Sequence, residues 1–183
     1  MLIANSTSAF LSTIFSWSAI PFVIWRSQLS IRHHVLFAAS ITGSLIALSY
    51  YFQGAIQGAI MVLFSVLITL TQGQLGRLQH PINTGYTRFG LSGIGILGGW
   101  VIAPPLTVIE FLPFVAFAIS KLAERNLNVV RLKSEQLVSM GVWLCYAIMV
   151  GNQGMIALNL SAMLMVSYWL LKQRNGLRKD FVR

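Results

Sequence analysis

Residues 50–65 read YYFQGAIQGAIMVLFS, and residues 146–161 read YAIMVGNQGMIALNLS. Each stretch consists of a tyrosine, six residues, Gln-Gly, six residues and a serine, and the second copy lies 96 positions after the first. In both copies the pattern joins the end of one apolar run to the start of the next. An echo at a fixed distance predicts that the chain contains a duplicated unit.

A shorter echo lies upstream of each copy. Residues 20–23 read IPFV and residues 112–115 read LPFV, which are 92 positions apart. Four extra residues between the two echoes would account for the difference between 92 and 96. The two echoes together predict two related halves of about three helices each, with a further segment between them.

The composition predicts that a lipid bilayer is the solvent of this chain. Of the 183 residues, 56% are hydrophobic and 9% are charged, and the mean hydropathy is +0.72. One soluble core cannot hide so much apolar surface. The net charge of +9 could indicate a nucleic-acid partner, but the Lys and Arg residues stand only between and after the apolar runs. Cytoplasmic loops of membrane proteins have this distribution, so we expect no nucleic acid as a partner.

Seven apolar runs can be read along the chain, at residues 8–25, 35–52, 55–71, 89–103, 106–119, 137–150 and 155–171. Several are shorter than the roughly 20 residues that usually cross a bilayer, which predicts short helices or local thinning of the bilayer. A charged segment, residues 121–135, is expected to separate the fifth run from the sixth. Residues 172–183 are expected to form a basic cytoplasmic tail, and Cys145, inside an apolar run, a buried and inert thiol.

The 13 basic residues predict the topology. They lie after the first, third, fifth and seventh runs, and none lies before the first run or in the other three connections. Seven crossings with the N-terminus outside and the C-terminus in the cytoplasm place all of them on one side, whereas six crossings would not. The predicted location is the bacterial inner membrane, as a multi-pass protein.

Seven crossings also agree with the duplication. Two three-helix units whose matching corners face the same side need an odd number of helices between them. We therefore predict an all-α membrane protein with two parallel three-helix repeats joined by a linker helix, a 3+1+3 arrangement. Within a single domain of residues 1–183, the repeats are residues 8–74 and 106–171, and the linker helix is residues 89–103.

This pattern resembles the PQ-loop and SWEET superfamily, and within it the bacterial inner-membrane YgjV family. The segments that carry the resemblance are LIALSYYFQGAIQGAIMVLFSVLITL at residues 45–70 and VWLCYAIMVGNQGMIALNLSAMLMVSYWLL at residues 142–171. The resemblance implies a transporter with a substrate-facing asparagine on its third and seventh helices. Asn159 stands at a suitable position on the seventh helix, but its partner 96 positions earlier is Leu63. The sequence also departs from the family in having Phe22 and Phe114, where glutamine would follow each proline.

Asn159, Trp143, Tyr146 and Tyr50 are the candidate substrate contacts. An amide inside hydrocarbon needs a partner and usually faces the interior of a bundle. Hydrogen bonding between helices without a ligand is the alternative for Asn159. For the aromatic residues, the alternatives are an interfacial belt and ordinary core packing.

Two prolines and one carboxylate are candidates for the moving parts of a transporter. Pro21 and Pro113 each remove a backbone donor within a predicted helix, so each is a candidate hinge, and a static kink is the alternative. Glu110 is the only acidic residue inside an apolar run. It is a candidate for proton coupling, with solvation at the membrane surface as the alternative.

The predicted outer corners contain Gln57, Gly58, Gln153 and Gly154. A structural role is favoured there over an outer gate, because glutamine can cap the start of a helix and glycine permits close packing. Gly95 and Gly99 are expected to form a close-packing face on the linker helix. The spacing G-x-G-x-x-G at residues 93–98 follows no predicted strand, so a dinucleotide loop is not expected.

No combination of residues predicts an enzyme. Four acidic residues and a single cysteine provide no carboxylate dyad and no nucleophile with a base beside it. His33, His34 and His80 have no ligand-forming neighbours at suitable spacing, so neither a metal nor a cofactor is expected. The predicted function is movement of a small neutral solute by alternating access between the repeats. The alternative is a scaffold or accessory subunit that transports nothing, and a homo-oligomer is compatible with both.

Overall fold

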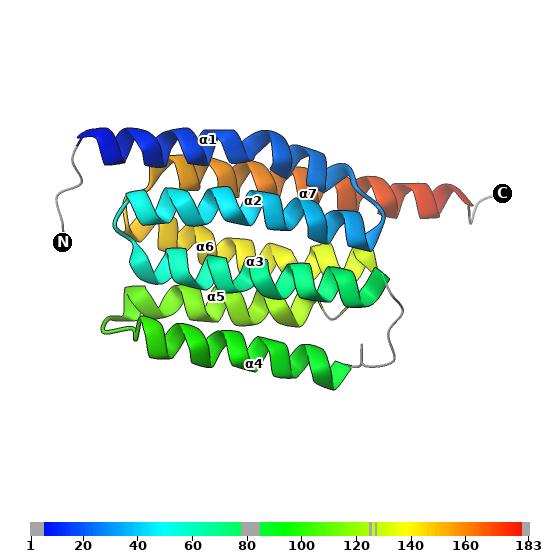
Figure 1. The fold of residues 1–183 in the computed structure, drawn as a ribbon. Coiled ribbons are helices and arrows are strands. Elements are labelled where there is room, and N and C mark those ends of the chain that lie inside the picture. The colour runs from blue at the N-terminus through cyan, green and yellow to red at the C-terminus, as the bar shows by residue number, and fades with distance from the viewer. Residues whose placement is uncertain (1–5, 78–84, 125, 127, 181–183) are drawn as a thin grey trace.

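The computed structural model of the chain describes residues 6–77, 85–124, 126 and 128–180, with the side chains of 75–77, 85–88 and 175–180 left out. These residues form seven helices (Figure 1). The helices are α1 (Ser6–Gln28), α2 (Arg32–Phe52), α3 (Ile56–Arg77), α4 (Gly85–Ile102), α5 (Val108–Glu124), α6 (Val129–Met149) and α7 (Gln153–Asp180). Consecutive helices run in opposite directions along a common axis (Figure 1).

The helix ends follow from local sequence. Gly54 and Gly151 have positive φ angles of 80° and 71°, and each directly follows the C-cap residue of a helix, α2 and α6 respectively. The next amide after each glycine bonds back to the last turn, Ala55 N to Tyr50 O and Asn152 N to Ala147 O, both at 3.0 Å. This is the Schellman arrangement, which satisfies carbonyls that a helix end leaves open.

Two polar side chains begin later helices. The Asn128 side chain accepts from the amides of Val130 and Arg131, which caps α6. At the start of α5 the Thr107 hydroxyl accepts from the Glu110 amide at 3.3 Å, and the Glu110 carboxylate accepts from the Thr107 amide at 3.2 Å. The two bonds form a capping box, for which Thr-x-x-Glu is the sequence signature.

The apolar helices suggest a membrane-embedded protein. Four of them have stretches long and apolar enough to cross a bilayer, at Ser6–Gln28, Arg32–Phe52, Ile56–Gln74 and Gln153–Arg174, and Phe89–Ile102 is a shorter apolar helix. Large apolar side chains such as Trp17, Leu67, Leu97 and Leu164 are exposed on the outside of the bundle. Such a surface is compatible with lipid and costly in water.

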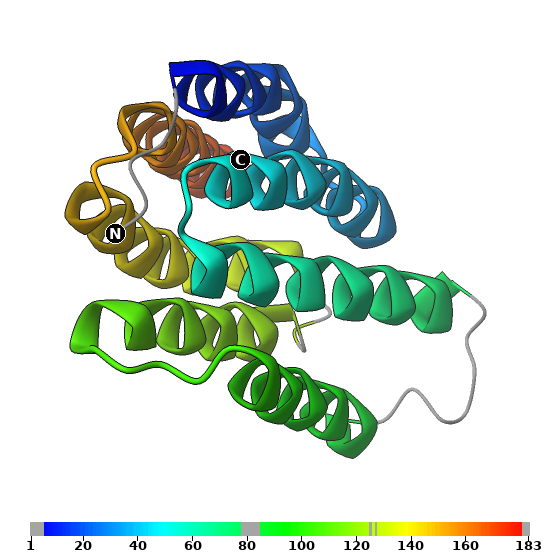
Figure 2. The same ribbon diagram turned by 60° about the vertical axis from the view of Figure 1, so that its left-hand side comes forward.

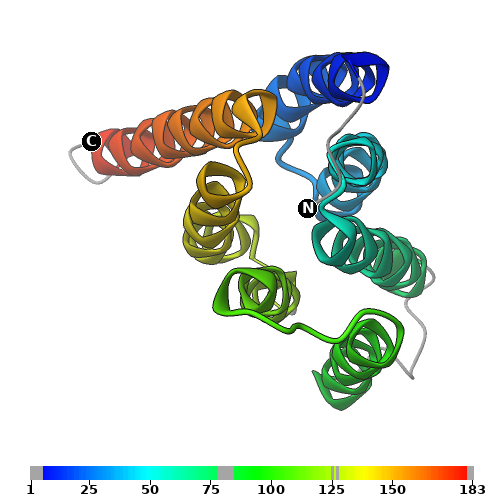
Figure 3. The same cartoon turned by 90° about the vertical axis from the view of Figure 1, so that its left-hand side faces the viewer.

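Six of the helices form a ring, and α4 lies outside it. Each of α1, α2 and α3 packs against the next, α5 packs against α6, and α6 against α7. The ring closes where α1 packs on α7 and where α3 packs on α5, as the end-on view in Figure 3 shows. Helix α4 packs against α3 and α5 at the edge of the bundle (Figure 2).

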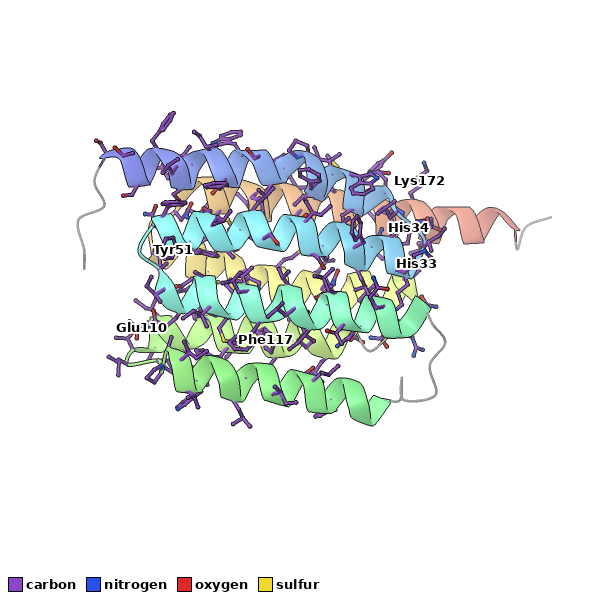
Figure 4. All side chains as sticks on the ribbon, in the orientation of Figure 1. His33, His34, Tyr51, Glu110, Phe117 and Lys172 are labelled. Atoms are coloured by element: carbon purple, nitrogen blue, oxygen red, sulfur yellow. The ribbon has the colours of Figure 1, made fainter. Side chains whose placement is uncertain are left out.

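The contact of α4 confirms the close-packing face expected at Gly95 and Gly99. A Cβ atom added at Gly95 would lie 2.5 Å from the Phe117 ring, and one added at Gly99 would overlap the sulfur of Met61. Phe117 lies midway along the bundle (Figure 4). Only glycine at these two positions allows α4 to approach this closely.

The charged segment of residues 121–135 is not the long connection that the sequence predicts. Lys121 and Glu124 belong to the last turn of α5, and α6 begins at Val129, eight residues before the predicted run. The charges fit inside the helices because several of them face the bundle and are bonded there. The predicted basic tail likewise continues α7 as far as Asp180, and the predicted boundaries of the other runs shift by a few residues.

Cys145 is exposed, so the expectation of a buried thiol is wrong. It lies on the outward face of α6, beside the buried Tyr146 and Ala147. Outward positions of a membrane helix are as apolar as inward ones, so hydropathy alone does not distinguish them. His80 lies outside the described residues.

The helix boundaries around the two glycine turns correspond at a distance of 97, one more than the Gln-Gly echo. Helix α6 begins and ends 97 positions after α2, α7 begins 97 positions after α3, and the turn glycines share this distance. Tyr50 precedes its turn glycine by four positions, whereas Tyr146 precedes its own by five. One residue is a rotation of about 100° on a helix, so the two tyrosines are not at matching positions.

The described basic side chains gather at one end of the bundle. They are Arg26, Arg32, Lys121, Arg131, Lys133, Lys172 and Arg174, and each lies at or near the helix end on that side. We call this the basic end, and the end that carries Gly54 and Gly151 the glycine-turn end. Figure 4 shows His33, His34 and Lys172 at the first, and Tyr51 and Glu110 at the second.

Candidate functional site

A cavity of about 120 Å³ lies in the middle of the six-helix ring. All six ring helices contribute to its wall, and none of the described residues that line it comes from α4. An enclosed space of about 150 Å³ can hold a molecule the size of benzene, so this cavity has room for several waters or a small organic solute.

The middle of the cavity has an apolar wall with a few polar groups. Ile46, Val62, Met140, Leu158 and Val166 are among its apolar residues. Asn159, Thr42, Ser65 and Ser139 add amide and hydroxyl groups. The Asn159 amide is 5% exposed and donates to the Met155 carbonyl of its own helix at 2.8 Å. This bond uses one of its donors, so the amide can still bind a solute.

Three aromatic rings meet at the glycine-turn end of the cavity. The rings of Tyr50 and Tyr146 lie 5.3 Å apart, and that of Trp143 lies 5.8 Å from Tyr50 and 6.0 Å from Tyr146. Only Trp143 reaches the cavity wall, whereas both tyrosines are fully buried behind it. The aromatic cluster therefore packs behind the cavity wall at this end.

The predicted corner glycines hold the ring together beside the aromatic cluster. A Cβ atom on Gly58 would lie 2.6 Å from the Tyr146 ring, and one on Gly154 would lie 2.6 Å from the Cβ atom of Ser16. Both glycines are buried, while the neighbouring Gln57 is half-buried and Gln153 is exposed. The glycines, more than the glutamines, bring the helices into contact here.

A buried polar network lies beside Gly154, where α1, α2 and α7 meet. The Ser16 and Ser49 hydroxyl oxygens are 2.7 Å apart, and those of Ser12 and Ser49 are 3.2 Å apart. The Asn152 side chain donates to both Ser12 and Ser49, and its oxygen accepts from the Met155 amide at the start of α7. The network joins the first two helices of the chain to the last one.

An ion pair lies at the other end of the cavity. Lys121 is 1% exposed and donates to both carboxylate oxygens of Glu124 at 2.7 Å. It also donates to the Thr69 hydroxyl at 2.5 Å and to the Ser65 carbonyl at 3.1 Å. Thr69 in turn donates to Glu124 at 2.9 Å. These bonds connect α5 to α3, and the pair leaves no net charge.

Two further cations, Arg26 and Lys133, line the same end of the cavity. Arg26 lines the cavity, is half-buried and donates to the Gln136 side-chain oxygen at 2.5 Å. Lys133 also lines it, is 2% exposed and donates to the carbonyls of Ser27 at 2.6 Å and Leu29 at 2.9 Å. Its ammonium lies 3.6 Å from the centre of the Trp169 ring. All these partners are neutral. The bonds that join α1 to α6 here therefore come from two cations, and no carboxylate accepts them.

The cavity wall repeats at the distance of 97. Nine pairs of lining residues have this spacing, and they include Val62 with Asn159, Thr42 with Ser139, Ile46 with Trp143 and Ser27 with Glu124. The other five pairs are Val23 with Ser120, Ala39 with Gln136, Gly43 with Met140, Ser65 with Ala162, and Thr69 with Val166. Leu63, the partner of Asn159 at a distance of 96, is instead 51% exposed on the outside.

The candidate hinges lie at different places in the bundle. Pro21 is exposed and Pro113 is buried, and both α1 and α5 continue through their proline. Their distance of 92 is five residues less than the spacing of the cavity wall, which is more than one helical turn. The symmetry that motivated the hinge prediction is therefore absent at these positions.

Glu110 lies far from the cavity charges, at the glycine-turn end (Figure 4). It is engaged in the capping box of α5 and also accepts from the Leu106 amide at 2.7 Å. His33 and His34, at the basic end, border a second cavity of about 330 Å³ between α2 and α3. Thr69 borders both cavities.

The charged residues of the cavity were not predicted, because every Lys and Arg was interpreted as part of a cytoplasmic loop between the apolar runs. A helical signal was nevertheless present. Lys121 and Glu124 are three positions apart, as are Lys133 and Gln136, and Gln136, Ser139, Met140 and Trp143 continue that face along α6. Residues three and four apart share one face of a helix.

Comparisons with protein-family models, curated proteins and solved structures found no match for this chain.

Proposed function

We propose that this chain is a seven-span transporter that moves a small polar solute through the central cavity by alternating access. In this proposal α1 to α3 and α5 to α7 are parallel repeats and α4 is the linker helix. The nine cavity-lining pairs at a distance of 97 are the observation that carries the proposal. A cavity at the boundary between two related halves is the typical binding site of transporters built from repeats.

The contacts between the helices support the same repeat. Replacing α1, α2 and α3 by α5, α6 and α7 converts the α1–α7 contact into the α5–α3 contact, and it converts the contacts within one half into those within the other. The duplicated corner and the resemblance to the PQ-loop and SWEET superfamily, and to the YgjV family, agree with this arrangement. The basic end would face the cytoplasm of a bacterium, with the N-terminus outside.

The two ends of the cavity supply the gates. At the glycine-turn end, the gate is the aromatic cluster of Tyr50, Trp143 and Tyr146. At the basic end, the gate consists of the bonds from Arg26 and Lys133 across the α1–α6 contact and from Lys121 across the α3–α5 contact. A rocking motion that separates one set of contacts while keeping the other would expose the cavity to one side at a time.

Uptake into proteoliposomes tests the proposal. The panel contains radiolabelled sugars, neutral amino acids and small organic acids, and empty liposomes set the background. The expected result is saturable uptake of at least one compound, reduced severalfold by Asn159→Ala, while Leu63→Ala on the outer face leaves it unchanged. Uptake that is insensitive to Asn159→Ala would remove Asn159 from the site.

A rigid scaffold without transport is the second candidate. The observation that favours it is that buried polar contacts hold the helices together toward both ends of the bundle, namely the Lys121–Glu124 pair and the Ser16–Ser49–Asn152 network. This candidate predicts no uptake of any compound in the panel by protein that is folded and correctly inserted. Saturable uptake of any one of them contradicts it.

A further inference from the structure

The charges at the basic end of the cavity do not balance. Arg26, Lys133 and Glu124 all line this end of the cavity, and Lys121 is bonded to Glu124. Three cations therefore face one carboxylate, and that carboxylate is already paired with Lys121 at 2.7 Å. Lys121 and Lys133 are 1% and 2% exposed, whereas Arg26 is partly exposed. Cations held in a membrane protein away from water are costly unless an opposite charge is near them.

No other carboxylate whose side chain the structure describes is placed to compensate for them. The chain has four acidic residues. Glu110 caps α5 at the glycine-turn end, and Glu135 accepts from the Asn126 side chain at 2.7 Å. Asp180 stands at the end of α7, beyond the bundle. Within the part of the chain that the structure describes, neither Arg26 nor Lys133 has a carboxylate within 4.0 Å.

Arg26 lines the cavity and makes one hydrogen bond to a described residue. A guanidinium has five N–H groups, and among the described residues Arg26 uses one nitrogen, for the bond to Gln136. The planar fork of a guanidinium matches a carboxylate in a two-bond geometry. Lys133 is fixed nearby by Ser27 and Leu29, so it supplies positive potential without having to move.

The remaining cavity selects the body of the ligand. Beyond Arg26 the wall is mostly apolar, with Val62, Met140, Leu158 and Trp143, and Asn159 is a polar group in the middle. Inorganic phosphate would leave this apolar part unfilled. A carboxylate with a short apolar body would occupy both parts, and the volume of about 120 Å³ limits it to a small molecule.

We propose that the solute of this cavity is a small organic carboxylate, with its carboxylate on Arg26 beside Lys133 and its apolar body toward Asn159 and Trp143. The inference rests on the proposed transport function and replaces the neutral solute that the sequence predicts with an anionic one. Lys121 and Glu124 are already bonded to each other, so the pair does not supply the charge for the solute.

Binding by the full-length protein tests the inference without requiring transport. The protein is purified in detergent with phosphatidylcholine, and its melting temperature is measured with butyrate, benzoate, their neutral amides butyramide and benzamide, and inorganic phosphate. The expected result is a concentration-dependent rise with a carboxylate, and a dissociation constant at least tenfold weaker for its amide and for phosphate. Equal effects of acid and amide would overturn the proposal.

Variants identify the site. Arg26→Gln is expected to weaken carboxylate binding at least tenfold, and Arg26→Lys less, because it keeps the charge but loses the fork. Arg131→Gln, an exposed cation at the same end of the bundle, is the matched control and should bind as the wild type does. Equal losses in Arg26→Gln and Arg131→Gln would contradict the assignment, and if Arg26→Gln does not fold, the comparison of acid with amide still decides.

Two further arms separate the possible sources of the anion and the two proposals. If phosphatidylglycerol abolishes carboxylate binding, a lipid headgroup occupies Arg26, which contradicts a solute site. Uptake of neutral compounds without carboxylate binding would overturn the inference and leave transport standing. Carboxylate binding without any uptake would leave the inference standing and overturn transport.

Discussion

Single residues at the centre of this bundle have well-defined tasks. Gly58 lets the Tyr146 ring pack against the backbone of α3, and Asn159 presents an amide to the cavity. Trp143 and Asn159 could be predicted as cavity residues from the sequence, because a large amphipathic ring and an amide stand out in an apolar run. Tyr50 and Tyr146 lie behind the wall instead. Arg26 could not be predicted, because a basic residue near a helix end is usually solvated. Lys133 could have been found from its three-residue spacing to Gln136.

Adding a methyl group at Gly58 should destabilise the protein. In Gly58→Ala the new Cβ atom would meet the Tyr146 ring at 2.6 Å, and this ring is held by Tyr50 and Trp143. Overpacking of this kind costs about 1–3 kcal/mol. Gly93→Ala is the control, because no atom lies within 4 Å of its added Cβ atom. Thermal unfolding in detergent measures both, and equal stability of the two variants would contradict the close contact.

Loss of one partner of the buried Lys121–Glu124 ion pair should destabilise the protein. Glu124→Gln removes the charge that compensates Lys121, and the loss of one partner of a buried pair costs about 3–5 kcal/mol. The double variant Lys121→Met/Glu124→Leu should recover most of that stability, because it leaves no buried charge without a partner. Chemical denaturation in detergent measures the two variants. A double variant no more stable than the single one would contradict this account of the pair.

At the scale of elements, the number and order of the helices could be predicted, and the register between the halves could not. Apolar runs separated by Pro, Gly and basic residues indicate seven helices, because each crossing needs its own apolar stretch. The Gln-Gly echo gives a distance of 96, whereas the helix boundaries differ by 97. The repeated Gln-Gly pattern shows only that residues are identical at a distance of 96. The turn glycines, 97 positions apart, set where the next helix begins. The start of α6 was missed because its charges face inward.

Removal of the capping box should weaken α5. Glu110→Ala loses the bonds to the Leu106 and Thr107 amides, and the loss of a cap costs about 0.5–2 kcal/mol. Adding Thr107→Ala should cost less than in the wild type, because the two side chains act together. Thermal unfolding of the two single variants and the double variant measures the coupling.

The variant Glu110→Gln removes only the charge of this side chain. Loss of uptake driven by a pH gradient in this variant, at unchanged stability, would support a role of Glu110 in proton coupling.

The two prolines allow a test of the hinge prediction. If α5 bends at Pro113 during transport, Pro113→Ala should restore the backbone bond, stiffen the helix and slow uptake severalfold with little change in the substrate concentration at half-maximal rate. Pro21→Ala on α1 is its counterpart. The initial rate of uptake in proteoliposomes, divided by the amount of folded protein, is the measurement. Unchanged rates in both variants would show that the prolines are static kinks.

On the scale of the whole molecule, the two ends of the bundle differ in chemistry. At the glycine-turn end aromatic rings and a serine network pack together, and at the basic end cations donate hydrogen bonds across the bundle. Aromatic and apolar contacts separate without leaving charges unpaired, whereas the cations at the other end can exchange carbonyl partners for water. Ends of such different composition around one cavity are compatible with the proposed opening of one end at a time.

Alternating access can be tested by measuring whether the cavity is reached from each side of the membrane. Thr42→Cys in a Cys145→Ser background places one thiol on the cavity wall, and Leu164→Cys places one on the outer face as a control. A membrane-impermeant maleimide is added to right-side-out and to inside-out vesicles. Alternating access predicts that Thr42→Cys is labelled from both sides and Leu164→Cys from neither. Labelling of Thr42→Cys from one side only, or from none, would contradict alternating access.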